Sequence, residues 1–132
     1  MTFTAQIDAW IAKSQARTEA VVKTAVQDTI NQAQSMVRVD TGFLKDSGQG
    51  AIGEMPSGVS INPNKDIKQP EWKPSSVAAS LLKWDLNSPF YFGWVANYAR
   101  HRENKDGFMR LASQNWPQHV NKAVARVKAE IK

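Results

Sequence analysis

The first quarter of the chain carries a hydrophobic pattern with the period of an α-helix. Residues 5–37 contain neither glycine nor proline, and the spacing of their apolar side chains predicts one long helix. Thr4 is the expected N-cap, because its hydroxyl can accept a hydrogen bond from an early free N–H. The apolar positions are Ile7, Trp10, Ile11, Val21, Val22, Ala25, Val26, Ile30, Ala33, Met36 and Val37.

The length of this helix exceeds what one compact domain can cover. A helix over 5–37 spans about 50 Å, whereas a domain of this size has a diameter of roughly 35 Å. Residues 13–19 are polar or small, so they have little to bury within their own subunit. The helix must therefore bend, break or project. A projecting helix of this kind is typical of a contact between copies, which is a first indication of a homo-oligomer.

Residues 39–74 differ from the helix in composition. Five of the seven glycines lie between Gly42 and Gly58, and four of the six prolines between Pro56 and Pro74. We interpret the segment as a hinge followed by an extended loop, with short strands near 50–55 and 59–62. Trp72 has few apolar neighbours in sequence, so it is either anchored on the domain or available to a partner.

Residues 75–132 combine a short helix, an aromatic strand and a C-terminal helix. Ser75 or Ser76 caps a helix predicted over 77–83. Aromatic and β-branched residues on both faces of the strand "PFYFGWVAN" predict that both faces are covered. The final helix begins near Gly107, and Pro117 should kink or restart it. Its apolar stripe is Met109, Ala112, Trp116, Val120, Val124, Val127 and Ile131.

These elements predict a single domain over 1–132 that combines helices with short strands. Trp84, Trp94 and Trp116 are expected in its core. The chain has no cysteine, which excludes disulfides and thiolate metal sites. Its N-terminus lacks the features of a signal peptide, and no apolar run reaches the ~18 residues of a membrane span.

The net charge of +5 is confined to the last quarter of the chain. Residues 100–132 hold eight basic and three acidic residues, whereas residues 1–99 hold nine of each. Such a surface attracts nucleic acid or an acidic partner, but a solvated helix face, whose cations favour the helix C-terminus, is the simpler interpretation. Both interpretations stay open from the sequence alone.

Three short motifs are better explained by structure than by chemistry. The sequence from Gly48 to Gly53 fits G-x-G-x-x-G, but the residues after it cannot begin the helix that a dinucleotide site requires. Asp40-Thr41-Gly42 matches one loop of an aspartic protease, which needs two; a turn held by Asp40 is the simpler interpretation. His101 and His119 lack the spacing of a metal site. We therefore expect no catalytic, cofactor-binding or metal-binding residues.

Three phrases in order resemble one protein family. "VDTGFLKDS" (39–47), "NSPFYFGWVANYARHRE" (87–103) and "GFMRLASQNW" (107–116) are similar to motifs of neck and tail-completion proteins of long-tailed bacteriophages, the group around the lambda-type minor tail protein Z. They cover about 36 of the 132 residues. Two departures stand out: the family usually has proline where Arg38 stands, and Glu-Tyr-Gly where Glu103 is followed by Asn104 and Lys105.

The resemblance implies a non-enzymatic virion protein at the head–tail junction, made in the bacterial host cytoplasm. It implies a homo-oligomeric ring, by analogy hexameric, that contacts the tail tube or terminator and head-completion proteins and, in passing, DNA. A tail terminator that caps the tube is the alternative, and a small basic nucleic-acid-binding protein is a second one. No membrane contact and no cofactor are expected.

The same resemblance implies an α+β fold with two helices packed on a small antiparallel sheet, and it assigns a hinge and a strand-to-helix connection within that fold. The structural hinge is Asp40, Thr41, Gly42, Phe43 and Leu44, of which Asp40 and Thr41 fix the turn, Gly42 takes the strained torsion and the last two re-enter the core. The strand-to-helix connection comprises Tyr98, Ala99, Glu103, Gly107, Phe108, Met109 and Arg110, with Tyr98 and Glu103 pinning it. Candidate partner contacts are Trp72, Arg100, Arg102, Lys122 and Arg126.

Overall fold

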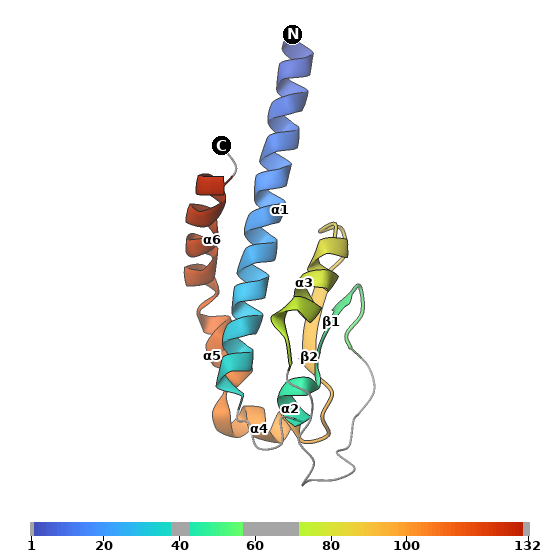
Figure 1. Ribbon diagram of the computed structural model, residues 1–132, viewed down its shortest axis with the longest axis vertical. Coiled ribbons are helices and arrows are strands. Elements are labelled where there is room, and N and C mark those ends of the chain that lie inside the picture. The colour runs from blue at the N-terminus through green and yellow to red at the C-terminus, as the bar shows by residue number, and fades with distance from the viewer. Residues whose placement is uncertain (1, 38–42, 57–71, 131–132) are drawn as a thin grey trace.

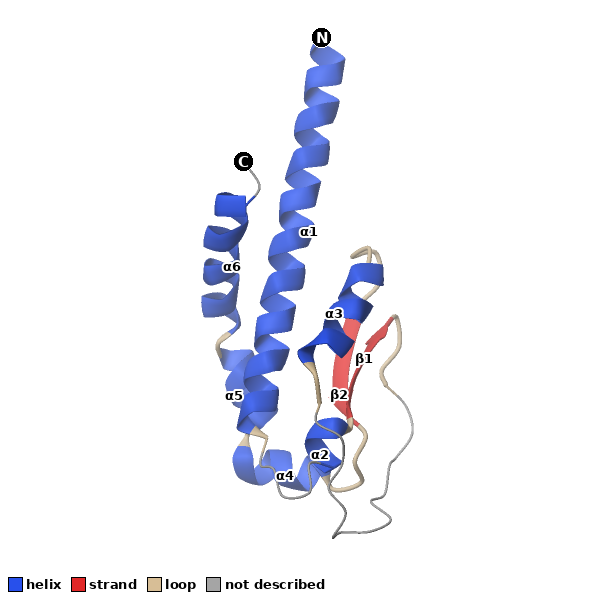
Figure 2. Ribbon diagram, in the orientation of Figure 1, coloured by secondary structure: helices blue, strands red, loops and turns tan. Residues whose placement is uncertain are grey.

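The computed structural model describes residues 2–37, 43–56 and 72–130, and it has the predicted α+β composition (Figures 1 and 2). Most of the described chain is helical, with one small antiparallel sheet. The elements in chain order are α1 (Phe3–Met36), α2 (Phe43–Asp46), β1 (Gly48–Ile52), α3 (Pro74–Lys83), β2 (Phe90–Trp94), α4 (Ala99–Asp106), α5 (Phe108–Gln114) and α6 (Trp116–Glu130).

Helix α1 is 34 residues long and projects beyond the rest of the molecule, as Figure 1 shows. Its N-cap is Thr2, whose Oγ1 accepts a hydrogen bond from the Ala5 N–H at 3.1 Å, so the prediction of Thr4 was wrong. Ala25 is its first buried residue. Of the three possibilities for so long a helix, projection is the one observed, and the N-terminal half lacks a core to pack against.

The sheet has two antiparallel strands, with Gly48 opposite Trp94 and Ile52 opposite Phe90. Strand β1 begins two residues before the predicted 50–55 segment, and the predicted strand at 59–62 lies outside the described residues. A Cβ at Gly50 would come within 2.8 Å of the Phe90 ring. The two glycines of β1 therefore serve close packing beneath aromatic rings.

The molecule is layered around α1 (Figure 1). Helix α6 packs along one side of α1, while α3 and the sheet lie on the other. Two hydrophobic clusters hold these layers together. The α3 cluster consists of Ile30, Val77, Leu81 and Trp84. The hinge cluster consists of Val37, Phe43, Leu44, Ala96 and Phe108.

The segment after β2 forms three helices where the sequence predicted one. Helix α4 was not expected, because its sequence is almost entirely polar and buries no residue. The predicted restart near Pro117 is confirmed: α5 ends before Asn115, and α6 begins at Trp116. Met109 and Trp116, predicted to be buried, are 48% and 39% exposed, because α5 and α6 do not share one continuous helical phase.

Candidate functional site

The hinge after α1 is anchored by two apolar side chains. Phe43 and Leu44 are both buried in the hinge cluster, on the short helix α2. Asp40, Thr41 and Gly42, the other residues of the predicted hinge, lie outside the described residues. The part of the hinge that the structure describes is thus a hydrophobic anchor that fixes where the chain turns from α1 towards β1.

A buried amide, Gln34, joins the three elements that meet at this hinge. Its side chain is 1% exposed. Its Nε2 donates a hydrogen bond to the Lys45 carbonyl at 3.0 Å, and its Oε1 accepts one from the Trp94 indole at 3.0 Å. Both ends of the amide are therefore satisfied, as a buried polar group requires. Sequence reasoning missed Gln34, since a polar residue on a mostly polar helix carries no distinguishing signal.

The connection from α4 to α5 is pinned by Glu103. Its carboxylate accepts hydrogen bonds from the backbone N–H groups of Met109, at 2.8 Å, and Arg110, at 3.0 Å. A carboxylate at this position satisfies free N–H groups of the first turn and complements the helix dipole. Gly107, with φ +66°, is the C-cap of α4 and the N-cap of α5.

The other residues of this connection pack or stay exposed. Phe108 is fully buried in the hinge cluster, and Tyr98 and Ala99 pack against that cluster while partly buried. Met109 and Arg110 contribute their backbone N–H groups while their side chains are exposed. The role of this connection in the fold is therefore structural: it fixes the turn between α4 and α5.

The candidate partner contacts are scattered and differ in their exposure. Trp72 is partly buried against the α3 cluster, with its ring edge-on to Phe92 at a centroid distance of 6.4 Å. It is therefore anchored on the domain. Arg102 contacts Asp106 at 2.7 Å through Nη2 and 3.0 Å through Nε, so it is internally paired.

The remaining cations among these contacts lie on the surface. Arg100 and Lys122 are exposed, and Arg126 makes a long ion pair of 3.9 Å with Asp28. Of the three acidic residues in this region, Glu103 and Asp106 are already engaged within the fold. The excess positive charge of the last quarter is thus presented mainly to solvent.

Four exposed large apolar side chains lie close together on the projecting half of α1. Phe3 is 76% exposed and Trp10 is 69% exposed, and Ile7 and Ile11 are also exposed. An isolated aromatic side chain on a surface needs no explanation, but four large apolar residues within three turns form a patch. Ile7, Trp10 and Ile11 belong to the apolar pattern of the predicted helix. That they are exposed can be inferred only once the position of the core is known.

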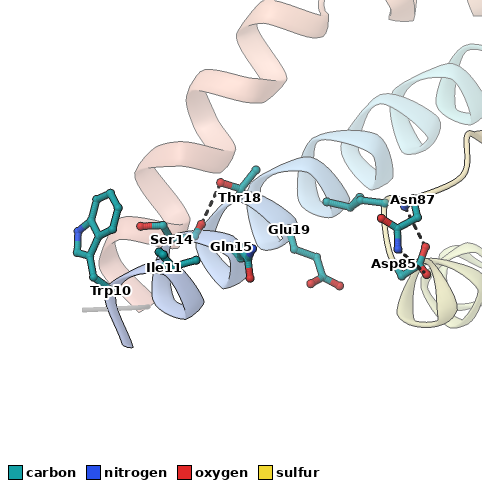
Figure 3. A pocket seen from close by; sticks show the side chains of 9 residues that line it. Trp10, Ile11, Ser14, Gln15, Thr18, Glu19, Asp85 and Asn87 are labelled. Atoms are coloured by element: carbon teal, nitrogen blue, oxygen red, sulfur yellow. Dashed lines mark hydrogen bonds between the residues drawn. The ribbon is translucent and has the colours of Figure 1, made fainter. Parts of the chain in front are cut away.

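A groove runs beside this patch, between α1 and the turn that follows α3 (Figure 3). Its volume is about 510 Å³, and it is lined by Trp10, Ile11, Ser14, Gln15, Thr18, Glu19, Asp85, Leu86 and Asn87. Several polar groups of the groove already have partners within the chain. The Thr18 hydroxyl donates to the Ser14 carbonyl at 3.0 Å, and Glu19 pairs with Lys23 at 2.7 Å.

Asp85 forms the wall of the groove and is held by Asn87. Its carboxylate accepts hydrogen bonds from the Asn87 backbone N–H at 2.9 Å and from the Asn87 side chain at 3.1 Å. These two bonds, the backbone one first, lower the pKa of Asp85 below its ordinary value of 3.8. The wall of the groove is therefore a carboxylate that stays ionised under all but acidic conditions.

Within the described residues, no group of three or more His, Cys, Asp or Glu side chains is placed to hold a metal ion. His119 contacts Gln32, with Nε2 2.6 Å from Oε1, and His101 is exposed. None of the described helices combines the length and hydrophobicity of a membrane crossing. Comparison of the chain with protein-family models, curated proteins and solved structures found no match.

Proposed function

We propose that this chain is a virion structural protein that joins a bacteriophage tail to its head, as one subunit of a homo-oligomeric ring. The proposal starts from the three ordered phrases and what their resemblance implies. In the fold, all three phrases contribute to the hinge cluster, which contains Phe43 and Leu44 from the first, Ala96 from the second and Phe108 from the third. The residues that carry the resemblance therefore shape the corners of the domain.

The observation that carries the proposal is the exposed apolar patch on the projecting half of α1. In proteins, most of the stability of a helix comes from tertiary packing of its apolar face. Phe3 and Trp10 have no core of their own subunit beside them, since the first buried residue of α1 is Ala25. A surface of this kind is stabilised by contact with other protein, and a ring of identical copies supplies such contact to every subunit.

Mass photometry of the purified protein, alone and with tail tubes, tests this function. We expect a discrete species of several copies, and binding of that species to tube ends. A monomer that ignores tubes would refute the proposal. The tail terminator is the neighbouring alternative, and it is distinguished by its effect on assembly. A terminator stops the polymerisation of tube protein, whereas a completion subunit binds tubes that have already been capped.

A second candidate, a small basic nucleic-acid-binding protein, is favoured by the charge of the last quarter of the chain. Its exposed cations include Arg100, Lys105 and Arg110, while two of its three acids are engaged. The affinity of such a protein for duplex DNA would fall steeply as the salt concentration rises. Its binding releases counterions from the DNA phosphates, and added salt opposes that release. A ring held by apolar contacts should keep its copy number over the same range of salt.

A further inference from the structure

The projecting half of α1 carries an exposed apolar surface and, on the neighbouring side, a groove whose lining is partly polar and partly apolar. At about 100° per residue, Phe3, Ile7, Trp10 and Ser14 align on one side, which we call the α1 stripe. Ile11, Gln15 and Thr18 lie about a quarter turn further round, where they form the floor of the groove beside the Asp85–Asn87 turn. The same helix thus carries the α1 stripe and, next to it, one side of the groove.

The charges flanking these two surfaces have opposite signs. By the same helical geometry, Lys13 lies beyond the stripe, on the side away from the groove, and Arg17 lies on that side as well. Asp8 and Glu19 lie beyond the groove, where Asp85 adds a third carboxylate and Lys23 offsets Glu19. The stripe side of one molecule therefore complements the groove side of another in charge.

The interior of the groove favours an apolar occupant. The Thr18 hydroxyl, the Glu19 carboxylate and the Asp85 carboxylate already have partners within the chain. The apolar side chains that line the groove are Trp10, Ile11 and Leu86. Apolar side chains from a helix would remove these surfaces from water.

We propose that the α1 stripe of one copy seats in the groove of a second copy of this chain, with the two α1 helices side by side and parallel. The inference rests on the homo-oligomer proposed above and names the contact that builds it. The stripe and the groove share Trp10 and Ser14 at their border but face different directions, so each copy engages one neighbour with its stripe and another with its groove. Contacts of this head-to-tail kind close into a ring when the rotation between copies allows it.

The charge pattern argues against the symmetric alternative, in which two stripes meet antiparallel. A two-fold axis would set each flank beside its own copy, so that Lys13 of one molecule would face Lys13 of the other. Like charges placed beside each other in this way are destabilising. The parallel arrangement instead sets the flank of Lys13 towards the flank that carries Asp8 and Asp85.

The available area fits this arrangement. Phe and Trp each carry about 150–250 Å² of surface, so the stripe, with Phe3 and Trp10 largely exposed, presents on the order of 400 Å². Each stripe–groove contact is therefore about half of the ~800 Å² per partner of a standard interface. A closed ring compensates for this, because every copy makes two such contacts, one through its stripe and one through its groove.

Cysteine cross-linking tests the contact directly, because the chain has no cysteine of its own. Lys13 and Gln15 are both exposed and lie on nearly opposite sides of α1, so a short bismaleimide cannot join them within one molecule. With the double variant Lys13→Cys/Gln15→Cys, we expect a ladder of cross-linked species that ends at the copy number found by mass photometry. Each single variant should give no ladder.

The outcomes separate this inference from the proposed function. An oligomer without a ladder overturns the contact and leaves the ring standing. Dimers from either single variant also overturn it, because like surfaces would then meet. A monomer at every concentration overturns both the contact and the ring.

A pair of matched substitutions provides an independent test. Trp10→Ser removes the centre of the stripe, whereas Leu82→Ser removes a side chain that is 82% exposed on α3, outside the groove. We expect Trp10→Ser to raise the concentration at which the oligomer dissociates at least tenfold, and Leu82→Ser to leave it unchanged. Circular dichroism should show both variants folded. Equal effects of the two substitutions would overturn the contact.

Discussion

The indole N–H of Trp94 donates a hydrogen bond to the side-chain oxygen of Gln34 across 3.0 Å, and so joins β2 to the C-terminal turn of α1. The other end of the same amide donates to Lys45. We predict that Gln34→Leu lowers the free energy of unfolding by about 2–3 kcal/mol, because it leaves a buried donor and a buried acceptor without partners. Urea denaturation followed by tryptophan fluorescence measures this.

The control for that prediction is Gln6→Leu, at an exposed position of the same helix. Surface changes of this kind alter stability by at most about 0.5 kcal/mol. Equal urea midpoints for the two variants would show that the Gln34 bonds contribute nothing to stability.

Glu103 is predicted to stabilise α5 through its two backbone hydrogen bonds. Glu103→Ala should lower the free energy of unfolding by about 1 kcal/mol, which is typical for loss of an N-terminal cap. The amide protons of Met109 and Arg110 should exchange faster with solvent, because their acceptor is gone. Glu130→Ala, at the exposed end of α6, is the matched control and should leave those amides unchanged. Unaltered exchange in Glu103→Ala would contradict the capping role.

The two glycines at one end of the sheet should respond differently to an added methyl group. A Cβ at Gly48 would overlap the Gln34 side-chain nitrogen and come within 2.8 Å of the Phe92 ring, whereas one at Gly93 would meet only Pro56, at 4.0 Å. Gly48→Ala should therefore lower the thermal midpoint by several degrees, since overpacking costs roughly 1–3 kcal/mol. Gly93→Ala should change it little. Calorimetry of both variants decides, and the reverse order would be a clear refutation.

Asp85 should titrate at a lower pH than an ordinary aspartate. Its folded pKa lies below 3.8 because the backbone and side chain of Asn87 donate hydrogen bonds to the carboxylate. A lowered folded pKa stabilises the fold above the unfolded pKa, and that contribution is lost as the pH falls through the folded value. Asn87→Ala should raise the pKa of Asp85 towards 3.8. Carbon NMR titration from about pH 2 to 6 follows this directly, and an unchanged pKa would contradict it.

The hydrophobic pattern was sufficient to predict the long first helix and the restart near Pro117, whereas the α+β class was implied by the resemblance. Residues 3–36 lack glycine and proline, and Pro117 lacks the N–H of an interior helix position. Strand β2 was also predicted, since its aromatic residues favour an extended backbone. These features depend on local chemistry, which a sequence displays without its tertiary partners.

The rest depends on contacts between distant segments. Helix α4 has no apolar stripe, so its formation was not predictable from periodicity. The amide of Gln34 becomes distinctive only when Lys45 and Trp94 are placed around it. Likewise the groove combines α1 with a turn some seventy residues later, and no pattern within either segment indicates the other.

Both hydrophobic clusters lie against the C-terminal half of α1, and the projecting half takes no part in them. Selection for a well-folded monomer therefore acts weakly on the first five turns of the helix. Amino-acid changes there would pass a screen based on melting temperature or expression yield and still abolish any role that depends on neighbours. Variant libraries of this protein need an assembly readout to detect such changes.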